Sequence, residues 1–343
     1  MNTKLFDYLL PKEMIAQYPE RDRELSRLLV LNRSTTEVEH KHFKDITGYF
    51  RKGDVLVLND SRVLPARLTA RKDTGGSIDI LLLERIDHKR WHCLANGMKK
   101  GRDLLTISVG GVEAVLTKNE AFRTIDFLYD GDAYDIIREH GKMPLPPYIK
   151  RNNNKGDNDG VLDFERYQTV YAEILGSIAA PTAGFHFTKE LLDGIEARGV
   201  TIFKITLHIG IGTFFLVKSR NVEDHVMHRE YYNIVPDVKK YIENAKADGR
   251  RIIACGTSVV RTLETAWMKN GDTPDTGHTE LFIYPGYRFK IIDAMITNFH
   301  LPRSTPLLLV SAFAGRDELM RCYKEAVEQN YRFYSYGDAM LVI

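Results

Sequence analysis

Short apolar runs recur at nearly even spacing between positions 55 and 129, and Gly, Asp and charged residues separate them. Such runs, rich in β-branched residues and bounded by turn formers, predict β-strands. Gly110-Gly111 separates two of them, as in a tight hairpin. Many short strands at even spacing are typical of a small antiparallel barrel. We therefore expect strands at residues 55–58, 64–70, 78–83, 91–95, 104–109, 112–117 and 123–128.

Beyond residue 130 the pattern changes. A short helix is predicted over 133–140, ending at Gly141, and the prolines between 143 and 148 exclude regular structure there. After residue 160 helical and strand periods alternate. Helices are expected after the cap Thr188, from 235 to Gly249, and over 258–267 and 317–329, and strands over 201–207, 251–255 and 280–284.

This alternation predicts a layered α/β domain with a parallel or mixed sheet. The barrel-like segment then interrupts it as an insertion. We expect the α/β catalytic domain to comprise residues 1–62 and 148–343, and the inserted antiparallel β-barrel domain to comprise residues 63–147.

The composition supports a globular protein of two domains. The chain has 343 residues, of which 43% are hydrophobic and 27% charged. No apolar run approaches the roughly 20 residues that span a bilayer, and the first ten residues lack the features of a secretory signal. The three cysteines lie far apart, which argues against a zinc ribbon and indicates a reducing cytoplasm. Without heptads or a long apolar edge, a monomer is expected.

The net charge is only +2, but it is unevenly distributed. Residues 85–102 contain six Lys or Arg and one acid, Asp87, with Trp91 among them. A basic patch of this kind attracts phosphate even when the whole protein is nearly neutral. A solvated loop face is the simpler interpretation of the cluster by itself.

Six segments at strand ends or loops break every periodicity and concentrate Gly, Pro, Thr, His and charged residues. In α/β folds ligands bind at such positions. They also contain five of the eleven histidines, and imidazole moves protons near neutral pH. The segments are 60–67, 180–188, 206–214, 225–230, 255–264 and 296–302.

Three of these segments allow two interpretations each. His225 and His228 with Glu230 have a spacing that could suggest a metal, but the order differs from HExxH, so we expect no metal and favour loop packing. Gly210-Ile-Gly212-Thr213 could cradle a phosphate or simply turn tightly. In 256–264, Thr257 or Ser258 could cap a helix that faces an anion, with Arg261 serving a ligand or forming a surface ion pair with Glu264.

Taken together, these motifs are similar to those of one family over the whole chain. The sequence resembles the S-adenosylmethionine:tRNA ribosyltransferase-isomerases of queuosine synthesis. Small departures occur: Phe185 replaces a usual leucine, Phe215-Leu216 a polar-Pro pair, and Cys255 and Ser258 a commoner Val and Thr. The resemblance rests on residues 6–11, 15–17, 26–29, 141–149, 165–172, 179–184, 186–188, 206–208, 212–214, 227–228, 298–302 and 331–340.

The resemblance implies an α/β domain with an inserted β-barrel and a defined reaction. The ribosyl part of S-adenosylmethionine moves to 7-aminomethyl-7-deazaguanine at the tRNA wobble position and rearranges to give epoxyqueuosine-tRNA, while adenine and methionine leave. S-adenosylmethionine is thus a substrate, and no cofactor is implied. The enzyme is expected to be cytoplasmic.

The chemistry assigns candidate residues by type. Proton transfer needs a base near the carbon beside the sulfonium and a donor for departing adenine; the candidates are His186, His208, His228, His300, Glu230 and Glu264. Arginines suit the methionine carboxylate or a phosphate; the candidates are Arg62, Arg67 and Arg261. Further substrate-binding candidates are Asp60, Tyr148, Thr182, Thr213, Thr257 and Asn298, and tRNA-binding candidates are Lys99, Lys100, Arg102, Lys150 and Arg151.

The sequence does not distinguish the roles of the individual histidines. We expect the loops at 180–188, 206–214, 256–264 and 298–302 to meet at one edge of a single sheet. An ordinary methyltransferase is disfavoured because no glycine-rich loop follows the first strand. A non-catalytic RNA-binding module is disfavoured because RRM, KH and dsRBD signatures are missing.

Overall fold

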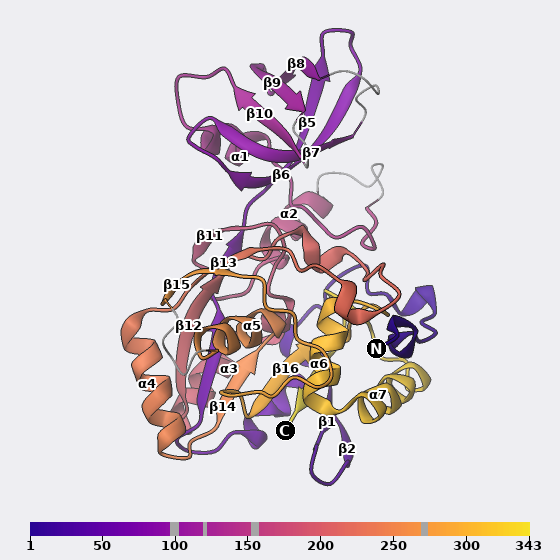
Figure 1. Cartoon of the computed structure of the whole chain (residues 1–343), viewed down its shortest axis with the longest axis vertical. Coiled ribbons are helices and arrows are strands. Elements are labelled where there is room, and N and C mark those ends of the chain that lie inside the picture. Colours follow the sequence, from indigo (N-terminus) through magenta and orange to yellow (C-terminus); the bar gives the residue numbers. More distant parts are fainter. Residues whose placement is uncertain (97–102, 119–121, 152–157, 269–273) are drawn as a thin grey trace. The chain divides into compact units, whose positions relative to one another are not determined.

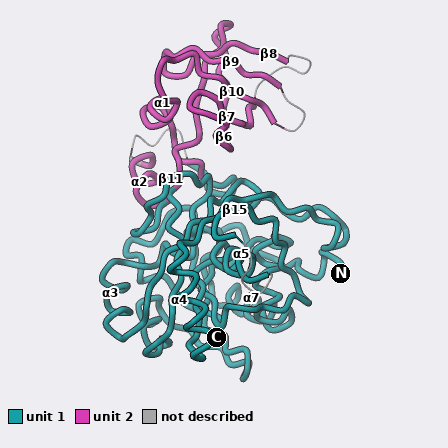
Figure 2. Tube along the Cα trace, turned by 60° about the vertical axis from the view of Figure 1, so that its left-hand side comes forward, with its two compact units in different colours: residues 1–62, 146–151, 168–343 teal, residues 63–145, 152–167 magenta. Residues whose placement is uncertain are grey.

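A computed structural model describes residues 1–96, 103–118, 122–151, 158–268 and 274–343. The chain forms two compact units (Figure 2). The first unit comprises residues 1–62, 146–151 and 168–343, and the second comprises residues 63–145 and 152–167.

The first unit is built on a nine-stranded mixed sheet (Figure 1). Its centre is parallel, because β3 (Val55–Asn59) pairs in parallel with both β12 and β14, and β14 pairs in parallel with β16. The strand order is β15 (Thr276–Thr279), β13 (Glu230–Asn233), β12 (Thr201–Leu207), β3, β14 (Ile252–Cys255), β16 (Ala294–Asn298), β17 (Ala339–Val342), β1 (Arg27–Leu31) and β2 (Val38–His42).

Alternate residues of the central strands enter two cores, one on each face of the sheet. Val55 and Val57 of β3 belong to one core, whereas Leu56 and Leu58 belong to the other. The first core is completed by α4 (Pro236–Ala247), α5 (Thr257–Ala266), α6 (Thr305–Ala314) and α7 (Arg316–Glu328), and the second by α3 (Lys189–Ala197) and the 3-10 helix η4 (Phe43–Tyr49). Burial on both faces explains why β3 and β14 consist almost entirely of apolar residues.

The second unit contains a closed antiparallel barrel with its own core. Gly110 and Gly111 both have positive φ, as a two-residue hairpin turn requires, and they connect β8 to β9. Helix α1 (Ala133–His140) adds Ile136 and Ile137 to the barrel core. The barrel order is β10 (Arg123–Phe127), β7 (Arg90–Asn96), β6 (Ser77–Arg85), β5 (Arg67–Lys72), β8 (Leu104–Val109) and β9 (Val112–Lys118).

The chain also forms helix α2 (Asn158–Arg166) and a short two-stranded ribbon. Helix α2 follows residues 152–157, which are outside the described ranges. Strand β4 (Ser61–Val63) pairs with β11 (Ile174–Ser177) in a short ribbon. Among the described residues, no helix has the combined length and apolar character needed to cross a bilayer.

The predicted fold class, an α/β sheet with an inserted antiparallel barrel, is confirmed. One predicted strand starts later than expected, and another is wrong. The run 64–70 is broken around Pro65, so β4 ends at Val63 and β5 starts at Arg67. The run 280–284 lies outside the sheet, and its place is taken by the more polar β15, which pairs with β13. Helix α6 escaped prediction because it is apolar nearly all round and therefore has no amphipathic period.

Candidate active site at the carboxyl edge of the sheet

Four parallel strands, β12, β3, β14 and β16, stand side by side and end at the same edge. The loops that follow them contain Asp60, His208, Gly256 and His300. The 3-10 helix η5 (Thr182–His186) joins this edge, because the Thr182 hydroxyl donates to Asn298 Oδ1 at 3.0 Å. The structure thus brings together the four loops expected to meet, at the place where α/β sheets bind ligands.

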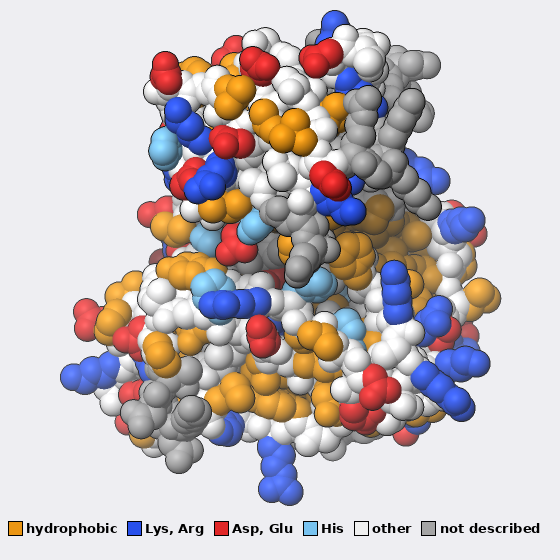
Figure 3. Space-filling model, turned by 45° about the horizontal axis from the view of Figure 1, so that its top comes forward, with side chains coloured by type: hydrophobic (Ala, Val, Ile, Leu, Met, Phe, Trp, Pro, Cys, Tyr) orange, Lys and Arg blue, Asp and Glu red, His pale blue; other side chains and the backbone are white. Residues whose placement is uncertain are grey.

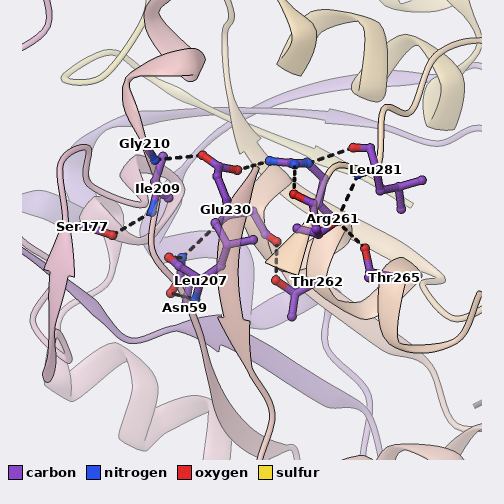
Figure 4. A network of polar contacts seen from close by, with 12 residues as sticks. Asn59, Ser177, Leu207, Ile209, Gly210, Glu230, Arg261, Thr262, Thr265 and Leu281 are labelled. Atoms are coloured by element: carbon purple, nitrogen blue, oxygen red, sulfur yellow. Dashed lines mark hydrogen bonds and ion pairs between the residues drawn. The ribbon is translucent and has the colours of Figure 1, made fainter. Parts of the chain in front are cut away.

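Asn59, the last residue of β3, organises the middle of this edge (Figure 4). Its amide donates to the Leu207 carbonyl at 3.0 Å and to Ser258 Oγ at 3.2 Å. Its Oδ1 accepts from the backbone N–H groups of Leu207 (3.1 Å) and Ser61 (3.0 Å). One fully buried side chain therefore connects three loops. Sequence analysis missed it, although a polar residue closing the apolar run Val-Leu-Val-Leu was a usable signal.

Asp60 and Ser177 continue this buried polar layer. Asp60 Oδ1 accepts from the Thr206 hydroxyl at 2.7 Å, and burial raises the pKa of its carboxyl. Ser177 Oγ donates to Ser61 Oγ and accepts from the Ile209 N–H, both at 2.9 Å. These contacts fix the backbone directions of the loops, so Asp60 is placed to hold the edge together.

Glu230 and Arg261 form a buried ion pair between β13 and α5 (Figure 4). Glu230 Oε1 also accepts from the Gly210 N–H at 2.8 Å. Arg261 Nε donates to the Leu281 carbonyl at 3.0 Å, and its Nη2 contacts the Thr279 carbonyl at 3.4 Å. The guanidinium is therefore occupied by protein groups from three segments.

Glu264 does not pair with Arg261, so the alternative of a surface ion pair between them is wrong. Its fully buried carboxylate accepts from the backbone N–H groups of Lys290 (2.9 Å to Oε2) and Ile291 (3.1 Å to Oε1), and from the Tyr287 hydroxyl at 3.1 Å. A carboxylate bonded in this way fixes the segment before β16.

The N-terminus of α5 has no side-chain cap among the described residues, so the expected capping by Thr257 or Ser258 is wrong. Gly256 takes the N-cap position with φ +96°, a conformation that glycine adopts without strain. Ser258 Oγ instead accepts from Asn59, and half-buried Thr257 begins the helix. The first N–H groups of α5 thus point to the sheet edge, where they favour negative charge.

His186 is buried, and both ring nitrogens have partners. Nδ1 lies 2.7 Å from Ser26 Oγ and Nε2 lies 3.1 Å from Asn298 Nδ2, while the ring packs 5.0 Å from Phe43. Burial, helped by the nearby cation Arg23, lowers the pKa of His186 to about 3. This histidine is therefore neutral and held in place from several sides.

His208 differs because one of its nitrogens lacks a partner. The ring stacks on Tyr231, with centroids 5.5 Å apart, and it lies against Gly176, where an added Cβ would come within 2.7 Å of it. Its Nδ1 is buried and, among the described residues, has no hydrogen-bond partner. Burial lowers the pKa of the half-buried imidazole and so favours its neutral form.

His300 is half-buried in the loop that follows β16. Its Nε2 lies 2.7 Å from Thr297 Oγ1, its backbone N–H donates to the Tyr323 hydroxyl at 2.9 Å, and its carbonyl accepts from Tyr8. Burial lowers its pKa to about 3.

The remaining candidates have other surroundings. His228 is exposed against Gly212, and Thr213 is half-buried in η6 (Ile211–Phe214). The Tyr148 hydroxyl lies 2.6 Å from Ser335 Oγ. Arg62 is exposed in β4, whereas Arg67 belongs to the barrel, where it pairs with Asp79 at 3.3 Å.

The tRNA candidates are only partly described. Lys99, Lys100 and Arg102 lie outside the described residues. Lys150 is exposed, and the Arg151 guanidinium donates to the Gln17 carbonyl at 2.7 Å. The described cations of the 85–102 cluster face acids, in the pairs Arg85–Asp132 (2.6 Å), Lys89–Asp130 (3.9 Å) and Arg90–Asp87 (2.7 Å).

No group of three or more His, Cys, Asp or Glu side chains within the described ranges is arranged to hold a metal ion. The His225, His228 and Glu230 motif does not assemble, because the Glu230 carboxylate is bonded to Arg261 and Gly210.

Comparison with known proteins decides the family. The family model described as "Queuosine biosynthesis protein" matches residues 3–342. The chain belongs to this family. The resemblance drawn from the motifs is thus confirmed over essentially the whole chain.

Two relatives specify the likeness further. A protein of Symbiobacterium thermophilum named S-adenosylmethionine:tRNA ribosyltransferase-isomerase is 49% identical over 344 residues, covering 98% of each chain. The crystal structure of S-adenosylmethionine tRNA ribosyltransferase from Thermotoga maritima is 36% identical, with a TM-score of 0.56, and the match covers 99% of this chain and 100% of that chain.

Proposed function

We propose that this chain is an S-adenosylmethionine:tRNA ribosyltransferase-isomerase. The observation that carries the proposal is the 49% identity, over 98% of both chains, to a protein with that name. In its finer form, the enzyme transfers the ribosyl group of S-adenosylmethionine to 7-aminomethyl-7-deazaguanine at the tRNA wobble position. The products are epoxyqueuosine-tRNA, adenine and methionine.

The reaction needs a group that removes a proton from the carbon beside the sulfonium. His208 fits this role best, because its imidazole is neutral and its Nδ1 has no partner among the described residues. An imidazole whose lowered pKa favours the neutral form is unprotonated before the reaction, as a general base must be. His186 is less suited, since both of its nitrogens are occupied.

Substrate carboxylate binding is assigned to the N-terminus of α5. Its N–H groups lack a side-chain cap within the described chain, and Thr257 adds a half-buried hydroxyl there. A helix N-terminus of this kind favours an anion such as the methionine carboxylate. Arg261, the sequence candidate for this role, instead fixes the loops through Glu230.

The remaining assignments concern partners and setting. We assign tRNA contacts to Lys99, Lys100 and Arg102 of the barrel and to Lys150 and Arg151. We further propose that the enzyme acts as a monomer, that S-adenosylmethionine is consumed without a cofactor, and that the enzyme works in the cytoplasm, where its tRNA substrate is found.

Product analysis tests the reaction. The enzyme is incubated with S-adenosylmethionine and tRNA carrying the aminomethyl base, and small molecules and digested tRNA are analysed by mass spectrometry. We expect adenine and methionine in equal amounts, together with a ribose-derived mass on the tRNA. Release of S-adenosylhomocysteine with a methylated tRNA would instead identify a methyltransferase.

A further inference from the structure

The segment from Ile211 to Arg229, which follows the His208 loop, exposes aromatic rings to solvent. Phe215 is 45% exposed, and its ring centroid lies 6.2 Å from that of exposed His228. The imidazole of His228 in turn lies directly against Gly212, where an added Cβ would come within 2.6 Å. The two rings thus form a supported pair at the surface.

A second group of rings is half-buried and involves His225 of the same segment. His225 packs edge-on to Phe282 at 5.1 Å, and Phe282 lies 5.1 Å from Tyr284. We name Phe215, His225, His228, Phe282 and Tyr284 the aromatic surface. Figure 3 shows histidine side chains beside hydrophobic ones on one face of the molecule.

This surface adjoins the candidate active site. Glu230, two residues after His228, binds the N–H of Gly210, two residues after His208. On its other side, the Val217 N–H donates to the carbonyl of Arg303, just beyond the His300 loop, at 2.8 Å. The aromatic surface therefore belongs to a segment held between the His208 and His300 loops.

Exposed cations flank the rings. Lys218 and Arg220 are exposed on the same segment, and Arg229 is held through its guanidinium, 3.0 Å from His278 Nδ1. The segment also has two acids: Glu223 is paired with the N-terminal amine at 2.7 Å, and exposed Asp224, which accepts from Asn221 at 3.1 Å, offsets one of the three cations. The charge that remains for a partner is positive.

We propose that the aromatic surface stacks unpaired bases of an RNA loop next to the reacting nucleotide. Aromatic and imidazole faces stack on any base, and neighbouring cations meet the backbone phosphates, which together is the chemistry of single-strand recognition. A protein partner would need apolar contact alone, and the cations beside the rings would then have no role. The inference rests on the proposed function, since it names the part of the tRNA that this face holds.

Fluorescence anisotropy with an unmodified tRNA transcript tests the proposal. Phe215→Ala should weaken RNA binding about five- to a hundred-fold, because loss of a single stack has an effect of this order. Phe215→Trp should restore affinity, because it restores a stacking face. Val226→Ala is the matched control: Val226 is 83% exposed on the same segment but has no ring, so its affinity should stay at the wild-type value.

Two further measurements make the result specific. A fully paired RNA duplex of equal length should bind equally well to the wild type and Phe215→Ala, because its bases are not free to stack. S-adenosylmethionine affinity and the melting temperature should also be unchanged in Phe215→Ala. None of these assays needs turnover, so a failure to transfer ribose would leave this inference standing and remove only the proposed function.

Three outcomes would overturn the proposal. Unchanged tRNA affinity in Phe215→Ala shows that the ring is not part of the RNA contact. An equal loss in Val226→Ala shows general apolar contact, as a protein surface would make. Weakened S-adenosylmethionine binding with intact tRNA binding shows that the ring belongs to the cosubstrate site.

Discussion

At the scale of single residues, three histidines that look alike in the sequence occupy different environments. His186 is clamped between Ser26 and Asn298, and His300 is bonded to Thr297. His208 alone among these three has a buried ring nitrogen without a partner in the described chain. A buried polar atom without a partner lowers stability, and such atoms are found mainly where function uses them.

This contrast predicts that His208→Ala reduces turnover, whereas His186→Ala reduces stability. His208→Ala should lose about two to four orders of magnitude in kcat, the usual effect of removing a general base, and should keep a Tm near that of the wild type. His186→Ala should instead lower the free energy of unfolding by about 1–3 kcal/mol, because it removes one hydrogen bond from each of the buried side chains Ser26 and Asn298. Single-turnover kinetics and thermal unfolding of both variants check this. Wild-type turnover in His208→Ala would show that another group is the base.

Some residues of the site were beyond sequence reasoning for a physical reason. The histidines, Thr182 and Asn298 were predicted because they stand in segments that break periodicity. Ser26 was not singled out, because its partner His186 is 160 positions away and no local pattern reveals the contact. The ion pair of Arg261 with Glu230 could not be predicted for the same reason, because Glu230 lies on a separate strand.

At the scale of elements, α5 connects the sheet edge to its surroundings. Its first turn contributes Ser258 to the Asn59 network, and its next turn contributes Arg261 to the ion pair with Glu230. The pair holds the Gly210 amide in turn. The helix therefore determines where the loop after His208 begins.

Arg261→Ala should act on folding more than on substrate binding. The change leaves the Glu230 carboxylate buried and unpaired, which typically lowers the free energy of unfolding by about 3–5 kcal/mol. Urea denaturation measures the loss. In the double variant Arg261→Met with Glu230→Gln the charge is removed from both partners, so stability should largely return. If Arg261→Ala raised only KM for S-adenosylmethionine, with unchanged stability, the arginine would be a ligand-binding group after all.

The elements themselves were predictable wherever a period or a cap marked them. Thr188 caps α3 through the Leu191 N–H at 3.1 Å, as expected, and the helix over 133–140 and the strand over 201–207 match the structure. The sequence does not predict strand β16, because its five residues are all buried and show no alternation. For such short buried runs, tertiary packing decides between helix, strand and loop.

At the scale of the whole molecule, the barrel is inserted after β3 and β4, where the chain leaves the catalytic edge. It has its own hydrophobic core. The insertion was predictable because strand-like runs at even spacing interrupt an α/β pattern. The described cations of its basic cluster are matched by acids, which the sequence could not show, because Asp132 lies 47 positions from Arg85.

Lys99, Lys100 and Arg102 are the tRNA candidates that the sequence offers within the inserted segment. Replacing Lys99, Lys100 and Arg102 with Glu should weaken tRNA binding, and each lost phosphate contact should reduce the slope of log K against log salt by somewhat under one unit. S-adenosylmethionine affinity should hardly change. Titrations at several salt concentrations measure the slope, with Arg85→Glu as a control in which an already paired cation is lost. An unaltered slope in the triple variant would place the tRNA contact elsewhere.

The position of β17 in the sheet also bears on how the protein is made. This strand lies between β16 and β1, and Leu28 of β1 pairs with Ala339 of β17, across almost the entire chain. On the ribosome, the apolar strand β1 emerges early, yet its parallel partner is synthesised only after both units have appeared. Until then β1 can pair only with β2. The hairpin of β1 and β2 therefore lacks its neighbouring strand until β17 has been synthesised, and closure of the sheet is a late step in folding.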